Sequence, residues 1–286
     1  MTPAPLRLGT RGSQLALYQA NAVSRLIGEA GGPPCELVII RTTGDRLQDR
    51  PLSEVGGKRL FVKEIEDALL RDEIDLAVHS SKDMPALLPD GLVIAGVLQR
   101  EDPRDALVLP ATRSVSVDTL EELVGALGES PSIGTASVRR VALLTRLIPS
   151  AKFAPMRGNL DTRLRKLDDG AYDALVLAAA GLRRLGFGAR ISFTLPLSAC
   201  VPSPGQGIIA IEIRSGDERV RRAVEAITDR TAAQALDAER GVVEALGGGC
   251  QTPIGALATP LGGNQFELIA AVVALDGSRI DRKSVV

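Results

Sequence analysis

The alternation of short apolar segments with amphipathic segments limits the fold of this chain more than any other feature of its sequence. Over the first two-thirds, segments of strand length are followed by longer segments whose apolar residues recur at helical spacing. This alternation is typical of α/β proteins. We expect strands at Leu6–Gly9, Leu37–Arg41, Ile74–Val78, Leu92–Val97, Ser132–Gly134 and Ala174–Ala178, and helices at Ser13–Ala30, Phe61–Arg71, Val138–Leu147 and Asp161–Asp169.

One apolar segment, Ile208–Ile213, follows after the second run of strands and helices is complete. Its expected partner is the first sheet, so the chain would cross back to the part where it began. We therefore predict a discontinuous first α/β domain at residues 1–103 with 204–226, which carries Asp83. A second α/β domain at residues 104–203 would carry an arginine-rich face, with a cleft between the two domains.

The pattern changes near Thr231, and a small third α+β domain is expected at residues 227–286. The dipeptide Asp276-Gly277 between apolar segments predicts a hairpin in this domain. The polar segment Leu47–Gly57, in the first domain, is expected to be either a flap over a site or an ordinary surface loop. The elements expected in the third domain are a helix at Ala232–Leu246 and strands near Ile254–Ala258, Phe266–Leu275 and Ser278–Val286.

The composition argues against several classes of protein. Aromatic residues make up only 2% of the chain, which argues against a surface that stacks single-stranded nucleic acid. An isoelectric point near 6.0 with scattered basic residues argues against binding of duplex nucleic acid. His79 is the single histidine and the three cysteines lack the spacing of metal ligands, so no metal site is expected. The chain shows neither a signal-peptide pattern nor a membrane-length apolar segment, and we expect a cytoplasmic location.

Basic and hydroxyl residues stand together where several expected strands end. The chain has 28 arginines and six lysines, which a bias of composition would explain equally well, but the positions of the arginines carry more information than their number. Carboxyl ends of parallel strands and amino ends of helices bind anions, so these positions predict a row of anion sites. Arg139 and Arg140 are adjacent on an expected helix and are not expected to share one carboxylate. Three segments carry the pattern: Thr10-Arg11-Gly12-Ser13, His79-Ser80-Ser81-Lys82-Asp83 and Thr135-Ala136-Ser137-Val138-Arg139-Arg140.

Two further residues suggest chemistry. Cys250 follows three glycines and precedes Pro253 by three residues, so its thiol is expected on a flexible loop. Such a thiol is either a small packing residue or a functional group presented to a ligand. Asp83 is a carboxylate among cations, and it either forms an ion pair with Lys82 or an arginine or serves as an acid–base group toward a ligand that becomes cationic.

A set of ordered motifs between about Leu6 and Gly255 resembles the porphobilinogen deaminase family, also called hydroxymethylbilane synthases. Together they make a chance agreement implausible. The chain departs from the usual pattern at Arg59, where a glycine is common, and at Val286, beyond which members usually continue into further helix. The third domain is therefore expected to be shortened. The motifs are Val55–Glu64, His79–Asp83, Arg100–Asp105, Gly134–Arg140, Arg157-Gly158-Asn159, Ala180–Leu185, Gly205-Gln206-Gly207 and Gly248-Gly249-Cys250.

This resemblance implies two α/β domains like those of periplasmic binding proteins and a small α+β third domain. It implies a transferase of tetrapyrrole biosynthesis that deaminates four porphobilinogen molecules and joins them head to tail into hydroxymethylbilane. The primer would be a dipyrromethane cofactor held by Cys250 through a thioether. Asp83 would be the catalytic carboxylate, stabilising the cation formed when porphobilinogen loses ammonia.

The resemblance also implies which residues bind the acetate and propionate groups of the pyrroles. The partner would be the small molecule porphobilinogen, with no nucleic acid, membrane or metal involved, and the chain would be a monomer. The expected cofactor-binding residues are Arg11, Ser13, Ser80, Lys82, Thr135, Ser137, Arg139, Arg140, Arg163 and Arg184, beside Cys250. The expected substrate-binding residues are Arg11, Lys58, Arg157 and Gln206.

Two other functions remain open at this point. A non-catalytic two-domain anion-binding protein would explain the arginines but would leave Cys250 and Asp83 without a role. Acyl transfer by the thiol is weaker, because His79 would have to act as the base for a cysteine on a different expected domain. The mass of the purified protein separates these functions, since only a deaminase would carry a covalent pyrrole group.

Overall fold

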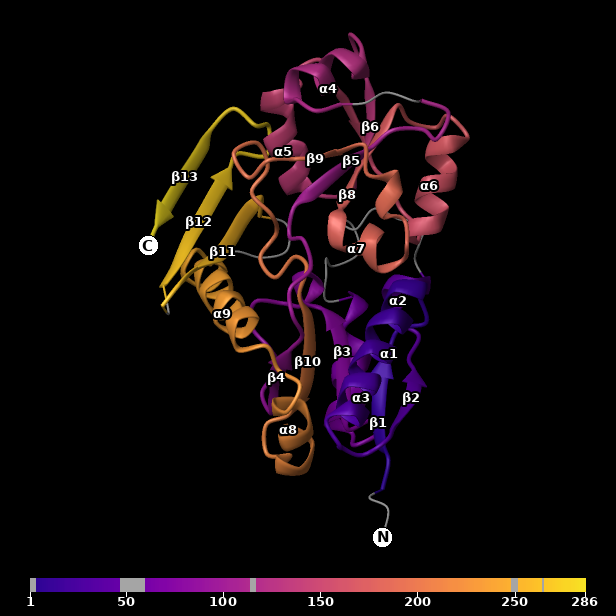
Figure 1. Cartoon of the computed structure of the whole chain (residues 1–286), viewed down its shortest axis with the longest axis vertical. Helices are drawn as coiled ribbons and strands as arrows, with labels where there is room; N and C mark the ends of the chain where they lie inside the picture. Colours follow the sequence, from indigo (N-terminus) through magenta and orange to yellow (C-terminus); the bar gives the residue numbers. More distant parts are fainter. Residues whose placement is uncertain (1–3, 47–59, 114–116, 248–251, 264) are drawn as a thin grey trace. The chain divides into compact units, whose positions relative to one another are not determined.

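The structure is a computed structural model that describes residues 4–46, 60–113, 117–247, 252–263 and 265–286 (Figure 1). Two compact units are present, each made of two separate stretches of chain. The first unit comprises Met1–Glu101 with Ile208–Cys250, and the second comprises Asp102–Gly207 with Gln251–Val286. The chain therefore leaves the first unit and returns to it, as the position of the late apolar segment predicts.

The first unit is built on a five-stranded sheet with the order β2-β1-β3-β10-β4. Strand β1 runs parallel to β2 and β3, whereas β10 runs antiparallel to β3 and β4. The prediction that the segment near residue 210 joins the first sheet is thus confirmed. The strands are β1 (Leu6–Thr10), β2 (Cys35–Ile39), β3 (Leu76–Ser80), β4 (Leu92–Val97) and β10 (Ile209–Arg214).

Helices of the first unit pack through their apolar residues on this sheet. Val23 and Ile27 of α1 are fully buried in a core that includes Leu8 of β1 and Ile211 of β10. Ser13 caps α1, because its Oγ accepts a hydrogen bond from the amide of Ala16 at 3.3 Å. The helices are α1 (Gln14–Glu29), α2 (Thr43–Arg46), α3 (Lys63–Leu70), the 3-10 turn η2 (Ser81–Asp83), α8 (Glu218–Glu225) and α9 (Arg230–Ala245).

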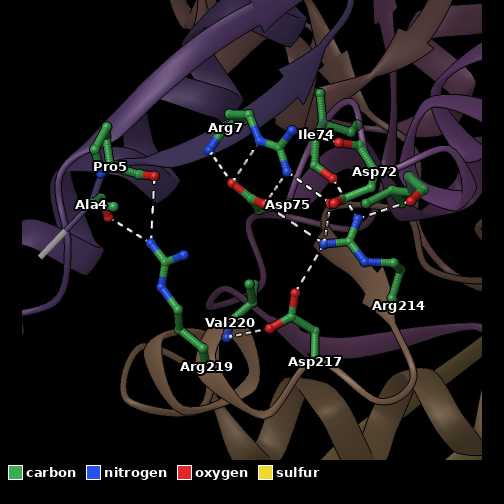
Figure 2. A network of polar contacts seen from close by, with 11 residues as sticks. Ala4, Pro5, Arg7, Asp72, Ile74, Asp75, Arg214, Asp217, Arg219 and Val220 are labelled. Atoms are coloured by element: carbon green, nitrogen blue, oxygen red, sulfur yellow. Dashed lines mark hydrogen bonds and ion pairs between the residues drawn. The ribbon is translucent and has the colours of Figure 1, made fainter.

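A polar network joins the amino ends of β1 and β3 to the end of β10. Figure 2 shows the guanidinium groups of Arg7 and Arg214 converging on Asp75 and Asp72. Arg7 donates to Asp75 from its backbone amide at 2.7 Å and from Nη2 at 2.6 Å. Because the network lies at the amino ends of these parallel strands, it leaves their carboxyl ends free for a ligand.

The second unit repeats this sheet design with different residues. Its order is β7-β6-β8-β5-β9, and β6 is parallel to β7 and β8 while β5 is antiparallel to β8 and β9. In each sheet the antiparallel strand in the fourth place, β10 or β5, begins just after the chain has crossed from the other unit. The strands are β5 (Asp105–Val108), β6 (Ser132–Gly134), β7 (Lys152–Ala154), β8 (Ala174–Ala178) and β9 (Phe193–Thr194).

Helices of the second unit also bury aliphatic faces. Leu143 and Leu144 of α5 pack in the same core as Leu107 of β5 and Ile133 of β6. The large side chains of this core are mostly Leu, Ile and Val, as expected for a chain with few aromatic residues. The helices are α4 (Leu120–Leu127), α5 (Val138–Leu147), α6 (Leu160–Asp168), α7 (Ala179–Arg184) and the 3-10 turn η3 (Gly188–Arg190).

A small antiparallel sheet follows α9, in the order β11-β12-β13. Its strands are β11 (Ile254–Gly262), β12 (Gln265–Val273) and β13 (Ile280–Val285). The predicted hairpin at Asp276-Gly277 is confirmed, because Gly277 has a φ of 72° and its amide donates to Ala274 at 2.9 Å. This sheet packs within the second unit while α9 packs within the first, so a third domain at 227–286 stays a prediction.

The fold class is therefore α/β with two similar sheets and a small third antiparallel sheet, as expected from the sequence. In the part of the chain that the structure describes, no helix combines the length and the apolar character needed to cross a membrane. The same residues include no group of three or more His, Cys, Asp or Glu side chains that could bind a metal ion.

Candidate active site

A pocket lies in the first unit where β1 and β3 end. The strands are parallel, so the residues that follow them come together at one edge of the sheet. Four residues singled out from the sequence meet here: Arg11, Ser13, Ser80 and Asp83. The remaining lining residues are Leu15, Ala16, Gln19, Phe61, Val62, Val78 and His79.

Asp83 reaches the pocket because a short 3-10 turn continues directly from β3. The amide of Ser81 donates to the oxygen of Ile208 at 3.0 Å, and the amide of Met84 donates to Ser81 at 3.1 Å. These bonds and the buried side chain of Met84 fix the backbone on both sides of Asp83. Within the described residues Asp83 forms no ion pair, so the expected alternative of a salt bridge with Lys82 or an arginine is not realised there.

Arg11 lines the pocket but already has a carboxylate partner. Its Nε lies 3.1 Å from Oδ1 of Asp45, its Nη2 also binds that carboxylate, and its guanidinium lies over the ring of Phe61 at 4.4 Å. Thr42 donates to the same carboxylate at 2.8 Å. Burial alone would raise the pKa of Asp45, but the hydrogen bond and the charge of Arg11 lower it below its ordinary value. Asp45 therefore binds the edge of the Arg11 guanidinium that carries Nε and Nη2.

The hydroxyl residues of the pocket are tied to the first helix. Ser13 caps α1, and Ser80 accepts a hydrogen bond from the amide nitrogen of the buried Gln19 at 2.9 Å. Lys82 lies in the same turn as Asp83 and is half-buried. Lys82 is not among the lining residues of the pocket, whereas Ser13 and Ser80 are. The two serines and Arg11 give the pocket hydrogen-bonding groups beside its carboxylate, which suits a polar, anionic ligand.

In the second unit, the predicted residues after β6 lead into α5. The amide of Ser137 donates to Oγ1 of Thr135 at 3.3 Å, and Ser137 itself caps α5 by accepting from the amide of Arg140. Arg139 and Arg140 are both buried, with 4% and 7% of their surface exposed. These two side chains do not point to solvent but to a carboxylate on the neighbouring strand.

The expectation that Arg139 and Arg140 would not share one carboxylate is wrong. Nη2 of Arg139 lies 2.8 Å from Oδ2 of Asp105, and Nη2 of Arg140 lies 2.7 Å from Oδ1. Asp105 begins β5 and offers one oxygen to each arginine, so the long side chains converge although their Cα–Cβ bonds diverge. The attraction of Arg139 and Arg140 outweighs burial and holds the pKa of Asp105 far below its ordinary value.

Three other predicted residues of the second unit donate to backbone oxygens. Nε of Arg163 donates to Gly158 at 2.8 Å, and Nη2 of Arg184 donates to Gly207 at 2.6 Å. The amide nitrogen of Gln206 donates to Pro103 at 2.7 Å and to Asp105 at 2.8 Å, and this side chain is buried. Arg157 is half-buried just before α6. Binding by these residues stays a prediction.

Several predictions lie outside the described residues. Cys250, Lys58, Arg59 and the polar segment 47–57 belong to this group. Conversely, the structure reveals polar contacts of Asp105, Cys200 and Asp45, which are not among the site residues predicted from the sequence. A carboxylate at the start of an apolar strand, as in Asp105-Ala-Leu-Val, was the available signal for a buried charge that needs a partner.

The molecule belongs to the class of α/β proteins in which a carboxylate, an arginine and hydroxyl groups line a pocket where two parallel strands end. This arrangement is suited to chemistry on an anionic ligand. The sequence comparisons give the family. Residues 6–222 match the model of the porphobilinogen deaminase dipyrromethane cofactor-binding domain, and residues 233–286 match the porphobilinogen deaminase C-terminal domain. The chain belongs to the porphobilinogen deaminase family.

Named relatives agree with this assignment. Porphobilinogen deaminase from Syntrophobacter fumaroxidans is 44% identical over 99% of this chain and 89% of its own length. The enzyme of the same name from Syntrophomonas wolfei is 45% identical over 95% of this chain and 86% of its own, and that from Geobacter metallireducens is 45% identical over 98% and 85%. This family is one of transferases in tetrapyrrole biosynthesis, so the comparisons do not favour a non-catalytic anion-binding protein.

Solved structures of lower similarity were also found. Immunogenic lipoprotein A from Vibrio vulnificus is 15% identical, with a TM-score of 0.48 over 82% of this chain and 99% of its own. An ancestral cationic amino acid solute-binding protein is 14% identical, with a TM-score of 0.47 over 83% of this chain and 94% of its own.

Proposed function

We propose that the chain is a hydroxymethylbilane synthase, which deaminates four porphobilinogen molecules and joins them head to tail on a dipyrromethane primer. The observation that supports this most directly is the position of Asp83, which lines a pocket together with Arg11, Ser13 and Ser80. A carboxylate beside an arginine and hydroxyl groups suits a substrate that carries carboxylates and becomes cationic during the reaction.

The donor groups of the chain fit a dipyrromethane, since each pyrrole ring carries an acetate and a propionate. Arginine forks bind such carboxylates at two points, and several arginines follow strands in both units. Cys250 would hold the group through a thioether, and the cofactor-binding residues expected from the sequence would bind its acidic side chains. When bound, the group supplies the free pyrrole carbon to which the first substrate is joined.

Asp83 would act on each substrate in turn. The C–N bond of the aminomethyl group breaks and the protonated amine leaves as ammonia, so positive charge develops on the pyrrole and its methylene carbon. The negative charge of Asp83 lowers the energy of this cation. After the new C–C bond forms, the attacked pyrrole carbon loses its proton, and the carboxylate of Asp83 is the group we propose to accept it.

The arginines would neutralise the growing product. Each addition brings two more carboxylates into the site, so the required positive charge increases with every step. Arg11 contacts Asp45 through Nε and Nη2 and not through Nη1. The edge of its guanidinium that carries Nη1 is therefore available to a substrate carboxylate. A monomeric state and a cytoplasmic location stay predictions.

The intact mass of the purified protein tests the proposal. It should exceed the sequence mass by two porphobilinogen units less the ammonia that they lose, and peptide mapping should place the excess at Cys250. An unmodified mass after incubation with porphobilinogen would exclude the deaminase function.

The role of Asp83 is tested by Asp83→Asn, which keeps the size of the side chain and removes its charge. Turnover should fall about 10²–10⁴-fold, the usual contribution of an acid–base group. Asp90→Asn is the control, because Asp90 is an exposed carboxylate of the same unit that is not among the lining residues of the pocket. Near-normal turnover of the Asp83 variant would disprove this role.

A further inference from the structure

The second unit contains a buried cluster of polar side chains centred on Asp105. This carboxylate is 0% exposed, and four side chains donate to it. Oδ1 accepts from Nε and Nη2 of Arg140 at 3.0 and 2.7 Å and from Gln206 at 2.8 Å. Oδ2 accepts from Nη2 of Arg139 at 2.8 Å and from Sγ of Cys200 at 3.2 Å. Every strong acceptor position of the carboxylate is therefore used.

The charges of this cluster do not balance. Arg139 and Arg140 contribute two positive charges and Asp105 one negative charge. Cys200 remains a neutral thiol, because burial and then the charge of Asp105 raise its pKa to about 12. Among the described residues, neither arginine is hydrogen-bonded to a second carboxylate. One positive charge is left in excess, and a buried excess charge is unfavourable unless an anion pairs with it.

The two arginines are not equivalent. Arg140 uses all three of its nitrogens for the protein, since Nη1 donates to the oxygen of Val176 at 2.9 Å while Nε and Nη2 bind Asp105. Arg139 donates from Nη1 to Val201 at 2.6 Å and from Nη2 to Asp105, and no described residue accepts from its Nε. Arg140 is therefore suited to stabilising the cluster, and Arg139 is suited to binding a ligand.

We propose that Asp105 is a positioning residue that holds Arg139 and Arg140 in fixed orientations and sets the charge of the pair to a single positive unit. The pair then matches one carboxylate of the pyrrole chain. This inference rests on the proposed function, because the ligand that supplies the carboxylate is the tetrapyrrole. Asp105 acts through the arginines and does not itself contact the ligand.

Asp105→Asn is the main test, because it keeps the shape of the side chain and raises the charge of the cluster from one to two positive units. We expect a folded variant with reduced cofactor occupancy by intact mass and with KM for porphobilinogen raised about tenfold, while kcat per cofactor-bearing molecule changes little. Asp105→Glu keeps the charge and should recover part of the lost occupancy. Asp168→Asn is the control, since Asp168 also binds an arginine of this unit, Arg190, at 2.7 Å, outside the cluster.

A double variant separates positioning from general stability. Asp105→Asn with Arg140→Gln returns the cluster to one positive charge, and it should fold and bind the cofactor better than Asp105→Asn alone. If Asp105→Asn proves too unstable to purify, this rescue of folding and occupancy remains measurable. A double variant that is worse than the single variant, or a folded Asp105→Asn with normal occupancy and KM, would overturn the inference. Failure of the proposed function looks different, because the wild-type protein itself would then carry no additional mass.

Discussion

Arg240 on α9 donates a hydrogen bond from Nη1 to the backbone oxygen of Pro85, which lies 3.0 Å away. Its Nη2 also donates to the oxygen of Ala86. These oxygens follow Asp83 by two and three residues, and α9 ends five residues before Cys250. The helix that leads toward the cysteine therefore holds the segment that leaves the pocket carboxylate.

Replacement of Arg240 should disturb the position of Asp83. Arg240→Met removes both hydrogen bonds and leaves two backbone oxygens without this donor, so the segment after Asp83 becomes less constrained. We expect kcat to fall about tenfold, because small displacements of a reacting group reduce rates strongly. Steady-state kinetics with a thermal unfolding curve measures this. Arg230→Met, an exposed change on the same helix, is the control and should keep its kcat. An unchanged kcat in the Arg240 variant would contradict the prediction.

Asp45 should act on substrate affinity through Arg11. Asp45→Ala frees the guanidinium from the carboxylate that holds its Nε edge, so more conformational entropy is lost when substrate binds. We expect KM for porphobilinogen to rise about fivefold with little change in kcat, since this interaction affects binding rather than the chemical step. Glu36→Gln, an exposed change on β2, should leave KM unaltered. A lower KM would instead show that Asp45 competes with the substrate for Arg11.

Asp75 should make the stability of the first unit depend on pH. Burial alone would raise the pKa of Asp75, but hydrogen bonds from Arg7 lower it below its ordinary value of 3.8. A carboxylate with a depressed pKa stabilises the folded state above its unfolded pKa and loses this contribution as the pH falls through its folded pKa. Asp75→Asn should therefore reduce the free energy of unfolding by about 1–3 kcal/mol at pH 7 and by much less near pH 2.

Urea denaturation at both pH values measures this difference. Asp72→Asn is a matched control within the network of Figure 2, because the Asp72 side chain is 71% exposed and its ion pairs with Arg7 and Arg214 are screened by solvent. Asparagine also tolerates the positive φ of 58° at this position. Equal losses for the two variants at pH 7, or a loss for Asp75→Asn that does not depend on pH, would contradict the prediction.

The sequence predicts elements best where local signals and burial agree. Helix α5 has its predicted bounds because Ser137 caps it and its apolar residues recur at helical spacing. Helix α4 was missed although Thr119 and Glu122 form a capping box that is visible in the sequence. Strands β7 and β9 have three and two residues, and only their neighbours in the sheet make them strands. Their own residues carry too little periodic pattern to predict them.

The residues of the candidate site also differ in how well the sequence predicts their contacts. Arg11 and Ser80 could be predicted to meet, because parallel strands place the residues after them at one edge of the sheet. Asp105 could not be paired with Arg139 from the sequence, since the partners are 34 residues apart and their contact depends on the neighbouring places of β5, β6 and β8. Side-chain direction across a sheet is a tertiary property, and adjacent numbering of two arginines does not determine it.

Gly277 should be a sensitive position in the hairpin of the small antiparallel sheet. Its φ of 72° is unfavourable for other residues, and a Cβ there would lie 2.8 Å from the backbone oxygen of Ala142 on α5. The oxygen of Gly277 also accepts from Nη1 of Arg146 at 3.0 Å, so the turn cannot move without loss of this bond. Gly277→Ala should therefore destabilise the second unit by about 2–4 kcal/mol, the sum of backbone strain and displacement of α5.

Gly186→Ala separates these two causes. Gly186 has a similar φ of 78°, but a Cβ there would meet no atom within 4 Å. This variant should lower the free energy of unfolding only by the backbone strain of about 1–2 kcal/mol. Thermal unfolding of both variants beside the wild type gives the comparison, and the additional loss in Gly277→Ala measures the close approach of the hairpin to α5. Equal shifts in melting temperature would mean that the hairpin yields without disturbing α5, the helix that carries Arg139 and Arg140.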